Sequence, residues 1–153
     1  MSKLQVITDV PNEITMIRTF NAPRHLLVKA MTTPELVKRW LGGTRASVIS
    51  AEMDLRVGGT YRWRFRRPDG GEFQFSGIIK EVSDDRIVHT ERFDDFPSES
   101  LVTTTYAEQA GITTMTVTVR FETAEIRDMV LKTGMSDGAG ESYDSLEALI
   151  KTL

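Results

Sequence analysis

The chain has 153 residues, of which 40% are apolar and 27% are charged. This length, within a range of roughly 100–200 residues, predicts a single domain over residues 1–153. The 19 Lys and Arg against 22 Asp and Glu give a formal net charge of −3. A main role in coating nucleic acid or an anionic membrane is disfavoured, because such proteins usually carry net positive charge. The absence of cysteine excludes disulfides, thiolate metal sites and a thiol nucleophile.

The chain shows no sign of membrane insertion or export. No apolar run approaches the length of about 20 residues that a membrane-spanning helix needs, and the N-terminus has no signal-peptide core. We therefore expect a cytoplasmic protein. Residues 1–12 are expected to form a leader strand or a loose tail.

A strand and two short helices are expected next. Residues 13–20 are rich in β-branched side chains and favour a strand. Asn21, as N-cap, and the following proline mark a helix start, and a Thr-Pro pair repeats the signal. Short helices are therefore expected over residues 24–31 and 35–41, where Gly-Gly ends the second.

Between residues 46 and 121 the hydrophobic pattern has a period of two, which is typical of antiparallel strands. A Pro-Asp-Gly-Gly turn predicts a hairpin whose two strands carry aromatic residues on one face. These residues are Tyr61, Trp63, Phe65, Phe73 and Phe75. The strands are expected over residues 47–57, 60–66, 72 onward, 86–93, 101–108 and 112–121, the last three joined by the loops DDFPSES (94–100) and EQAG (108–111).

The C-terminal region is expected to be helical, first over residues 124–133 after a Thr123 cap and then over residues 136–153, about 27 Å long. A one-faced sheet must bury its apolar face, and the long helix carries the matching apolar stripe. The stripe consists of Met135, Ala139, Tyr143, Leu146, Ile150 and Leu153. The sequence therefore predicts an α+β helix-grip fold, in which a curved antiparallel sheet of about six or seven strands wraps round this helix and the two short helices close one end.

Five motifs follow one another along the chain: RTFNAP at 18–23, TPELVKRW at 33–40, GGTYRW at 58–63, PDG at 68–70 and GMSDGAGESYDSL at 134–146. In this order they resemble the START-like (SRPBCC) superfamily and, within it, homologues of the activator of heat shock protein 90 ATPase. The resemblance extends from about residue 14 to the end. It implies a curved sheet that grips a long helix, with an apolar cavity between them. Ala139 stands where such proteins often have a bulkier residue, which implies a larger or differently shaped cavity.

Most candidate cavity residues are apolar or aromatic and are expected on inner faces. They are Trp40, Trp63, Phe65, Phe75, His89, Tyr106, Met115, Val117, Ala139, Tyr143 and Leu146. Any one of these aromatic rings taken singly is better explained as part of the core, whereas the set together also fits an apolar pocket. Tyr106, Tyr143 and His89 would supply polar contacts, with Arg64 as a further candidate.

Two local features leave alternatives open. His89 alternates with Glu91, so an inward face would make either a ligand contact or a general acid or base, whereas His89 could also be an ordinary hydrogen-bonded strand residue. Gly138 and Gly140 each cost a helix about 1 kcal/mol relative to alanine. They are explained either by close helix–sheet packing or by space left for a ligand.

Other motifs carry no catalytic or metal chemistry. Residues 134–138 spell G-x-S-x-G, but no histidine follows Ser136 and a helix precedes it, so a glycine break followed by a Ser or Asp helix cap is favoured over a nucleophile elbow. His25 and His89 form no ligand cluster, and no cofactor fingerprint is present. A basic stripe on the outward strand face could contact a phosphate or an acidic partner, but a solvated face paired with Glu72 and other acids is favoured. The stripe consists of Arg62, Arg64, Arg66 and Arg67.

The leading hypothesis is a non-enzymatic domain that binds a small hydrophobic or amphipathic molecule between the long helix and the sheet. One alternative is an enzyme like the polyketide cyclases or dehydratases found among START-like proteins. Another is a chaperone ATPase activator, although the resemblance covers only the C-terminal-type domain of such activators and leaves no room for their N-terminal domain. Pairing of exposed strand edges in a homodimer stays open.

Overall fold

The computed structural model describes residues 3–94 and 98–153. Residues 1 and 2 of the expected leader and residues 95–97 of the expected 94–100 loop lie outside the described residues. The elements in chain order are β1 (Gln5–Ile7), β2 (Glu13–Phe20), α1 (Arg24–Thr32), α2 (Pro34–Trp40), β3 (Ser47–Met53), β4 (Thr60–Arg66), β5 (Glu72–Val82), β6 (Arg86–Phe93), β7 (Glu99–Gln109), β8 (Ile112–Arg120), α3 (Ala124–Lys132) and α4 (Met135–Ile150).

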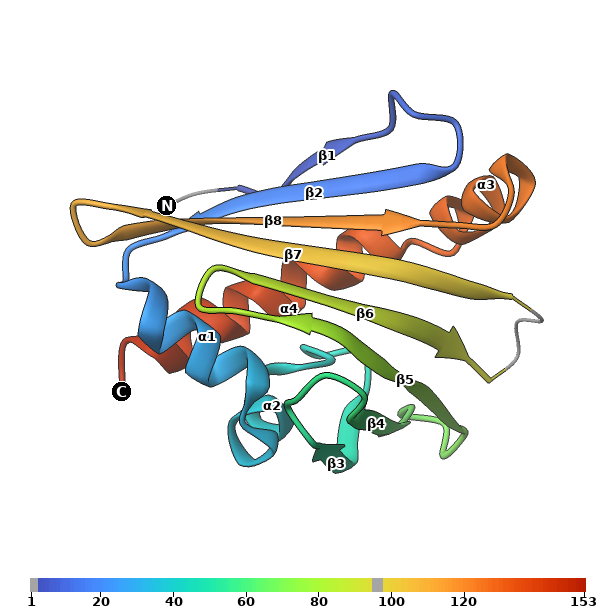
Figure 1. Ribbon diagram of the computed structural model, residues 1–153. Helices are drawn as coiled ribbons and strands as arrows, with labels where there is room; N and C mark the ends of the chain where they lie inside the picture. The colour runs from blue at the N-terminus through green and yellow to red at the C-terminus, as the bar shows by residue number, and fades with distance from the viewer. Residues whose placement is uncertain (1–2, 95–97) are drawn as a thin grey trace.

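Within the described residues the strands form one antiparallel sheet in the order β1-β2-β8-β7-β6-β5-β4-β3 (Figure 1). The sheet has eight strands, so the expected six or seven is wrong. The additional strand is β1, which lies in the segment expected to be either a leader strand or a loose tail, and in which Val6 lies opposite Met16 of β2. Its three residues are all exposed. No alternation of apolar and polar side chains therefore identifies this strand in the sequence. With the helices, this is an α+β architecture.

The helix starts differ in part from those expected. Thr123 caps α3 as predicted, because its hydroxyl oxygen accepts a hydrogen bond from the Ile126 amide at 3.1 Å. Asn21 does not cap α1, where Pro23 occupies the N-cap position without a side-chain bond. The expected Ser or Asp cap of the last helix is also absent: α4 starts after Gly134 at φ 79°, which places Ser136 inside the helix.

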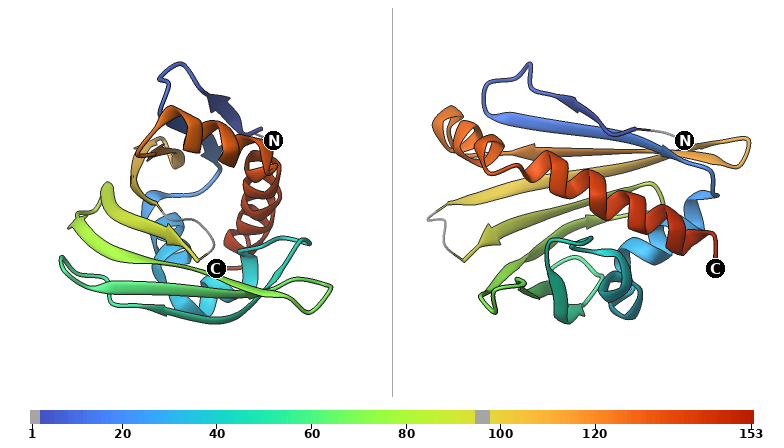
Figure 2. Two further views of the ribbon diagram at one scale, coloured as in Figure 1. Left: turned by 90° about the vertical axis from the view of Figure 1, so that its right-hand side faces the viewer. Right: turned by 180° about the vertical axis from the view of Figure 1, so that it is seen from behind.

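The buried core lies between the sheet and the C-terminal half of α4. Leu146, Leu149 and Ile150 of α4 pack in one cluster with inward side chains of β2 and β8. Strand β2 alternates strictly between half-buried and buried residues, as a one-faced strand should. Seen along the strands (Figure 2, left), the sheet bends from the blue strands to the green ones, and α4 faces its concave side. Leu153, expected at the end of the apolar stripe, lies beyond α4 and is 41% exposed.

Arg18 interrupts the apolar inner face of β2. Its side chain is 1% exposed, and Nη1 donates to Asp144 Oδ1 at 2.7 Å while Nη2 donates to Glu147 Oε2 at 2.9 Å. Both carboxylates are on α4, so this buried cation joins the helix to β2.

The two short helices lie beside α4 (Figure 2, right). Helix α2 packs against β3 and α4. The Trp40 indole Nε1 donates to the Ala30 carbonyl at 2.9 Å, which ties α2 to α1. In residues 3–94 and 98–153, no helix is long and apolar enough to cross a membrane.

Candidate ligand-binding cavity

A cavity of about 790 Å³ lies between the sheet and the N-terminal half of α4. Most of its lining comes from α2 and the loop that follows it, from strands β4 to β8, and from the first turns of α4, with further residues from α1, β2, β3, the β4–β5 turn and the segment before α4. Small-molecule sites commonly measure about 300–1,000 Å³ and are mostly apolar with a few polar groups. The size and lining of this cavity fit that description.

Nine of the eleven residues chosen from the sequence line the cavity: Trp40, Trp63, Phe65, Phe75, His89, Tyr106, Val117, Ala139 and Tyr143. The other two, Met115 and Leu146, are 1% and 0% exposed and belong to the packed core. The alternating strand pattern places a residue on the inner face, but it does not separate a cavity wall from a filled core.

Small residues on α4 contribute to the volume of the cavity. Gly138, Ala139 and Ser142 all contribute to the lining. A Cβ added at Gly138 would meet only the Arg45 side chain, at an ordinary contact distance of 3.8 Å, and one added at Gly140 would meet nothing within 4 Å. Close helix–sheet packing therefore explains neither glycine. At Gly138 the missing side chain adds to the cavity.

Aromatic rings form one wall. Phe75 and Phe93 lie on neighbouring strands with centroids 5.0 Å apart, and Tyr61 and Trp63 lie 5.4 Å apart. Tyr61, Phe73 and Phe93 also line the cavity, although they were not chosen from the sequence. The signal for all three was present, because each shares a strand face with a chosen residue.

Strand β6 turns polar groups into the cavity. Ile87, His89, Glu91 and Phe93 alternate along it, and all four line the cavity. This decides the question of the His89 face, which is inward. The His89 ring also makes a hydrogen bond within its strand: Nδ1 lies 3.0 Å from the Thr90 carbonyl oxygen. Because a carbonyl can only accept, Nδ1 carries the proton and Nε2 of the neutral ring is an acceptor.

Burial sets the ionisation of these groups. It lowers the pKa of His89, which favours the neutral ring. It raises the pKa of Glu91 to about 7. Burial first, and the negative charge of Glu91 second, raise the pKa of Tyr143 to about 12. The pKa of Tyr106 is raised as well, first by burial.

Three polar groups in the cavity have no protein partner in residues 3–94 and 98–153. Among the described residues, neither the Glu91 carboxylate nor the hydroxyl of Tyr106 or Tyr143 makes a hydrogen bond. None of these oxygen atoms is completely buried, so each retains some accessible surface in the cavity. They are free to bond a ligand.

The remaining charged residues of the lining, Arg45, Arg67 and Asp69, are exposed and therefore lie at its rim. Arg45 is half exposed and pairs with Glu141 of α4, and the Arg67 guanidinium lies 4.3 Å from the centre of the Phe73 ring. Arg64, a further candidate for ligand contact, is outside the lining. It is exposed and donates to Glu72 at 3.0 Å, as the solvated-face interpretation predicts.

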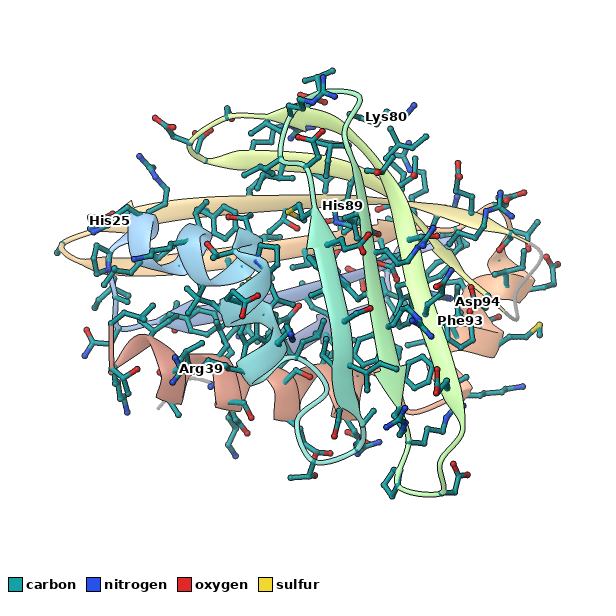
Figure 3. All side chains as sticks on the ribbon, turned by 90° about the horizontal axis from the view of Figure 1, so that it is seen from below. His25, Arg39, Lys80, His89, Phe93 and Asp94 are labelled. Carbon is teal, nitrogen blue, oxygen red and sulfur yellow. The ribbon has the colours of Figure 1, made fainter. Side chains whose placement is uncertain are left out.

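The described residues hold no cluster of three or more His, Asp or Glu side chains that could bind a metal ion. Viewed from below (Figure 3), His25 on α1 lies at one end of the molecule, well apart from His89 near the middle.

Comparison with known proteins places the chain in a family. The family model described as Activator of Hsp90 ATPase homolog 1-like protein matches residues 21–151. The chain belongs to this family. The resemblance inferred from the five sequence motifs is thereby confirmed. No curated protein matches the chain.

Solved structures share the fold across the whole chain. A protein of Rhodobacter sphaeroides is 25% identical, with a TM-score of 0.93 and coverage of 99% of each chain. A protein of Nitrosomonas europaea is 25% identical, with a TM-score of 0.85 and coverage of 94% of this chain and 97% of its own. A Mycobacterium smegmatis protein is also 25% identical, with a TM-score of 0.82 and coverage of 95% and 94%. Such a fold suits a ligand-binding or interaction domain.

Proposed function

We propose that residues 1–153 form one domain that binds a small hydrophobic or amphipathic molecule between α4 and the sheet, without catalysing a reaction. The observation that carries this proposal is the cavity of about 790 Å³ with aromatic walls and three polar groups that have no partner in the described part of the chain. Burial of apolar ligand surface would supply the affinity, at roughly 25 cal/mol per Å². The chaperone-related alternative rests on the family description alone.

A tryptophan at position 139 tests the proposal. Ala139 lines the cavity on α4, whereas Ala148 is an exposed residue of the same helix. We expect Ala139→Trp to fill the cavity and reduce the affinity for Nile red, a neutral fluorescent probe, by at least about tenfold, since a filled pocket loses the buried area that drives binding. The matched variant Ala148→Trp should bind the probe as the unmodified protein does. Equal probe binding by all three proteins would contradict the proposal.

A second candidate function is an acid–base enzyme that acts on a molecule held in the same cavity. It is favoured by Glu91, whose pKa of about 7 suits a group that both accepts and donates protons near neutral pH. The Tyr106 and Tyr143 hydroxyls in the same lining would help to position the reacting group.

Native mass spectrometry of protein purified from its own host separates the two candidates. If the protein only binds, Glu91→Gln and the unmodified protein should carry the same molecule, in different amounts. If Glu91 transfers protons in a reaction, the variant should retain unconverted substrate, and the molecules released from the two proteins should differ in mass or structure. Identical ligands on both proteins would reject the enzyme.

A further inference from the structure

We propose that the ligand carries a basic nitrogen, and that the Glu91 carboxylate is the group that binds it at the polar part of the cavity. This inference rests on the proposed binding function and specifies the chemical class of the ligand as a hydrophobic amine. It is carried by three features of the lining: unused acceptors, aromatic faces beside the carboxylate, and cations that lie only at the rim.

The inward groups of β6 are acceptors. Glu91 has no protein donor among the described residues, and His89 presents the acceptor Nε2, because its Nδ1 proton is engaged by the Thr90 carbonyl. Two acceptors two positions apart on one strand face suit a ligand group with several N–H donors. A protonated amine supplies such donors. It also supplies the positive charge that a buried carboxylate needs as its partner.

Aromatic rings line the same cavity as this carboxylate. Phe93 follows Glu91 on the inner face of β6, Phe75 lies opposite Phe93, and Trp63 lies opposite Phe75. Tyr61 completes this wall, with its ring centroid 4.9 Å from that of His89. The faces of such rings attract cations, and a carboxylate among aromatic rings is the chemistry that recognises an ammonium group.

The positive charges of the lining are not placed to neutralise Glu91. Arg45 is committed to Glu141, and Arg67 lies over Phe73 with its side chain exposed. Arg18, buried on β2, is outside the lining and binds Asp144 and Glu147. In the part of the chain that the structure describes, the inner lining therefore has a carboxylate and no cation. An anionic ligand would meet repulsion there.

Competition against Nile red tests the inference with three compounds that share a naphthylethyl body and end in an amine, a hydroxyl or a carboxylate. At pH 8, where Glu91 is mostly ionised, we expect the amine to displace the probe at roughly one-tenth of the concentration that the alcohol requires. Glu91→Gln should bring the amine within about threefold of the alcohol, when the displacement by each compound is corrected for the affinity of that variant for Nile red. Glu91→Asp, which keeps the charge, should retain part of the preference.

Glu99→Gln is the matched control, since it removes the same charge from an exposed position on β7 outside the cavity. It should keep the full amine preference. Nile red binding without an amine preference, a preference for the carboxylate or alcohol, or an amine preference that survives in Glu91→Gln would overturn the inference alone. Failure of the protein to bind Nile red at all would instead count against the proposed binding function.

Discussion

Burial brings the ionisation of Glu91 close to neutral pH. Its charge interacts with Tyr61 on β4 and Tyr143 on α4, it shares the cavity lining with His89 of its own strand, and burial raises its pKa from 4.5 to about 7. The folded state therefore holds a proton that the unfolded state releases between about pH 4.5 and 7. Glu91 thus favours folding at acid pH, and this contribution is lost as the pH rises through about 7.

Glu91→Gln should remove this dependence. Relative to the variant, the unmodified protein should lose roughly 2–3 kcal/mol of unfolding free energy between about pH 5 and 8, because one pKa unit corresponds to about 1.4 kcal/mol. Urea unfolding at a series of pH values measures the difference. The lowered pKa of His89 acts with the opposite sign, but it is common to both proteins and cancels. Parallel pH profiles would show that Glu91 is not buried as described.

The orientation of the two faces of β6 could not be predicted from the sequence. The alternation of β6 made it possible to name His89 and Glu91 as a pair with one orientation. The sequence left open which orientation was correct, because Val88 and Thr90 on the opposite face are buried as well. When both faces of a strand are buried, neither face is marked as the exposed one by polar residues.

At the scale of elements, the contact between β2 and α4 depends on Arg18. Its loss would leave Glu147, which is 12% exposed, without its partner in a largely buried position. We expect Arg18→Leu to lower the unfolding free energy by about 3 kcal/mol, since removing one partner leaves an uncompensated buried charge. Chemical denaturation at neutral pH measures this change.

Arg120→Leu is the control for Arg18, because its pair with Glu13 at 3.1 Å joins β8 to β2 but is 62% exposed on the arginine side. Exposed pairs contribute less than about 1 kcal/mol, so this variant should be nearly as stable as the unmodified protein. Equal losses for the two variants would mean that Arg18 does not join the helix to the sheet in the way described.

In the whole molecule, the inner face of the sheet both packs against α4 and lines the cavity. The C-terminal half of α4 fills the space above β2 and β8 with Leu146, Leu149 and Ile150. The N-terminal half contributes the small residues Gly138 and Ala139 to the lining and leaves the cavity. The cavity therefore follows from the distribution of side-chain size along one helix. A ligand that fills it would complete the apolar layer and stabilise the fold by mass action.

The sequence by itself determined the family, the α+β class, most strand and helix positions and the inner aromatic faces, because periodicity and turn residues act locally and survive without the rest of the chain. Tertiary structure decided the eighth strand, the buried ion pairs of Arg18, and the division of inward residues between packed core and cavity wall. Those depend on which distant segments meet: Arg18 and Glu147 are far apart in sequence and 2.9 Å apart in space. A local sequence pattern contains no information about that distance.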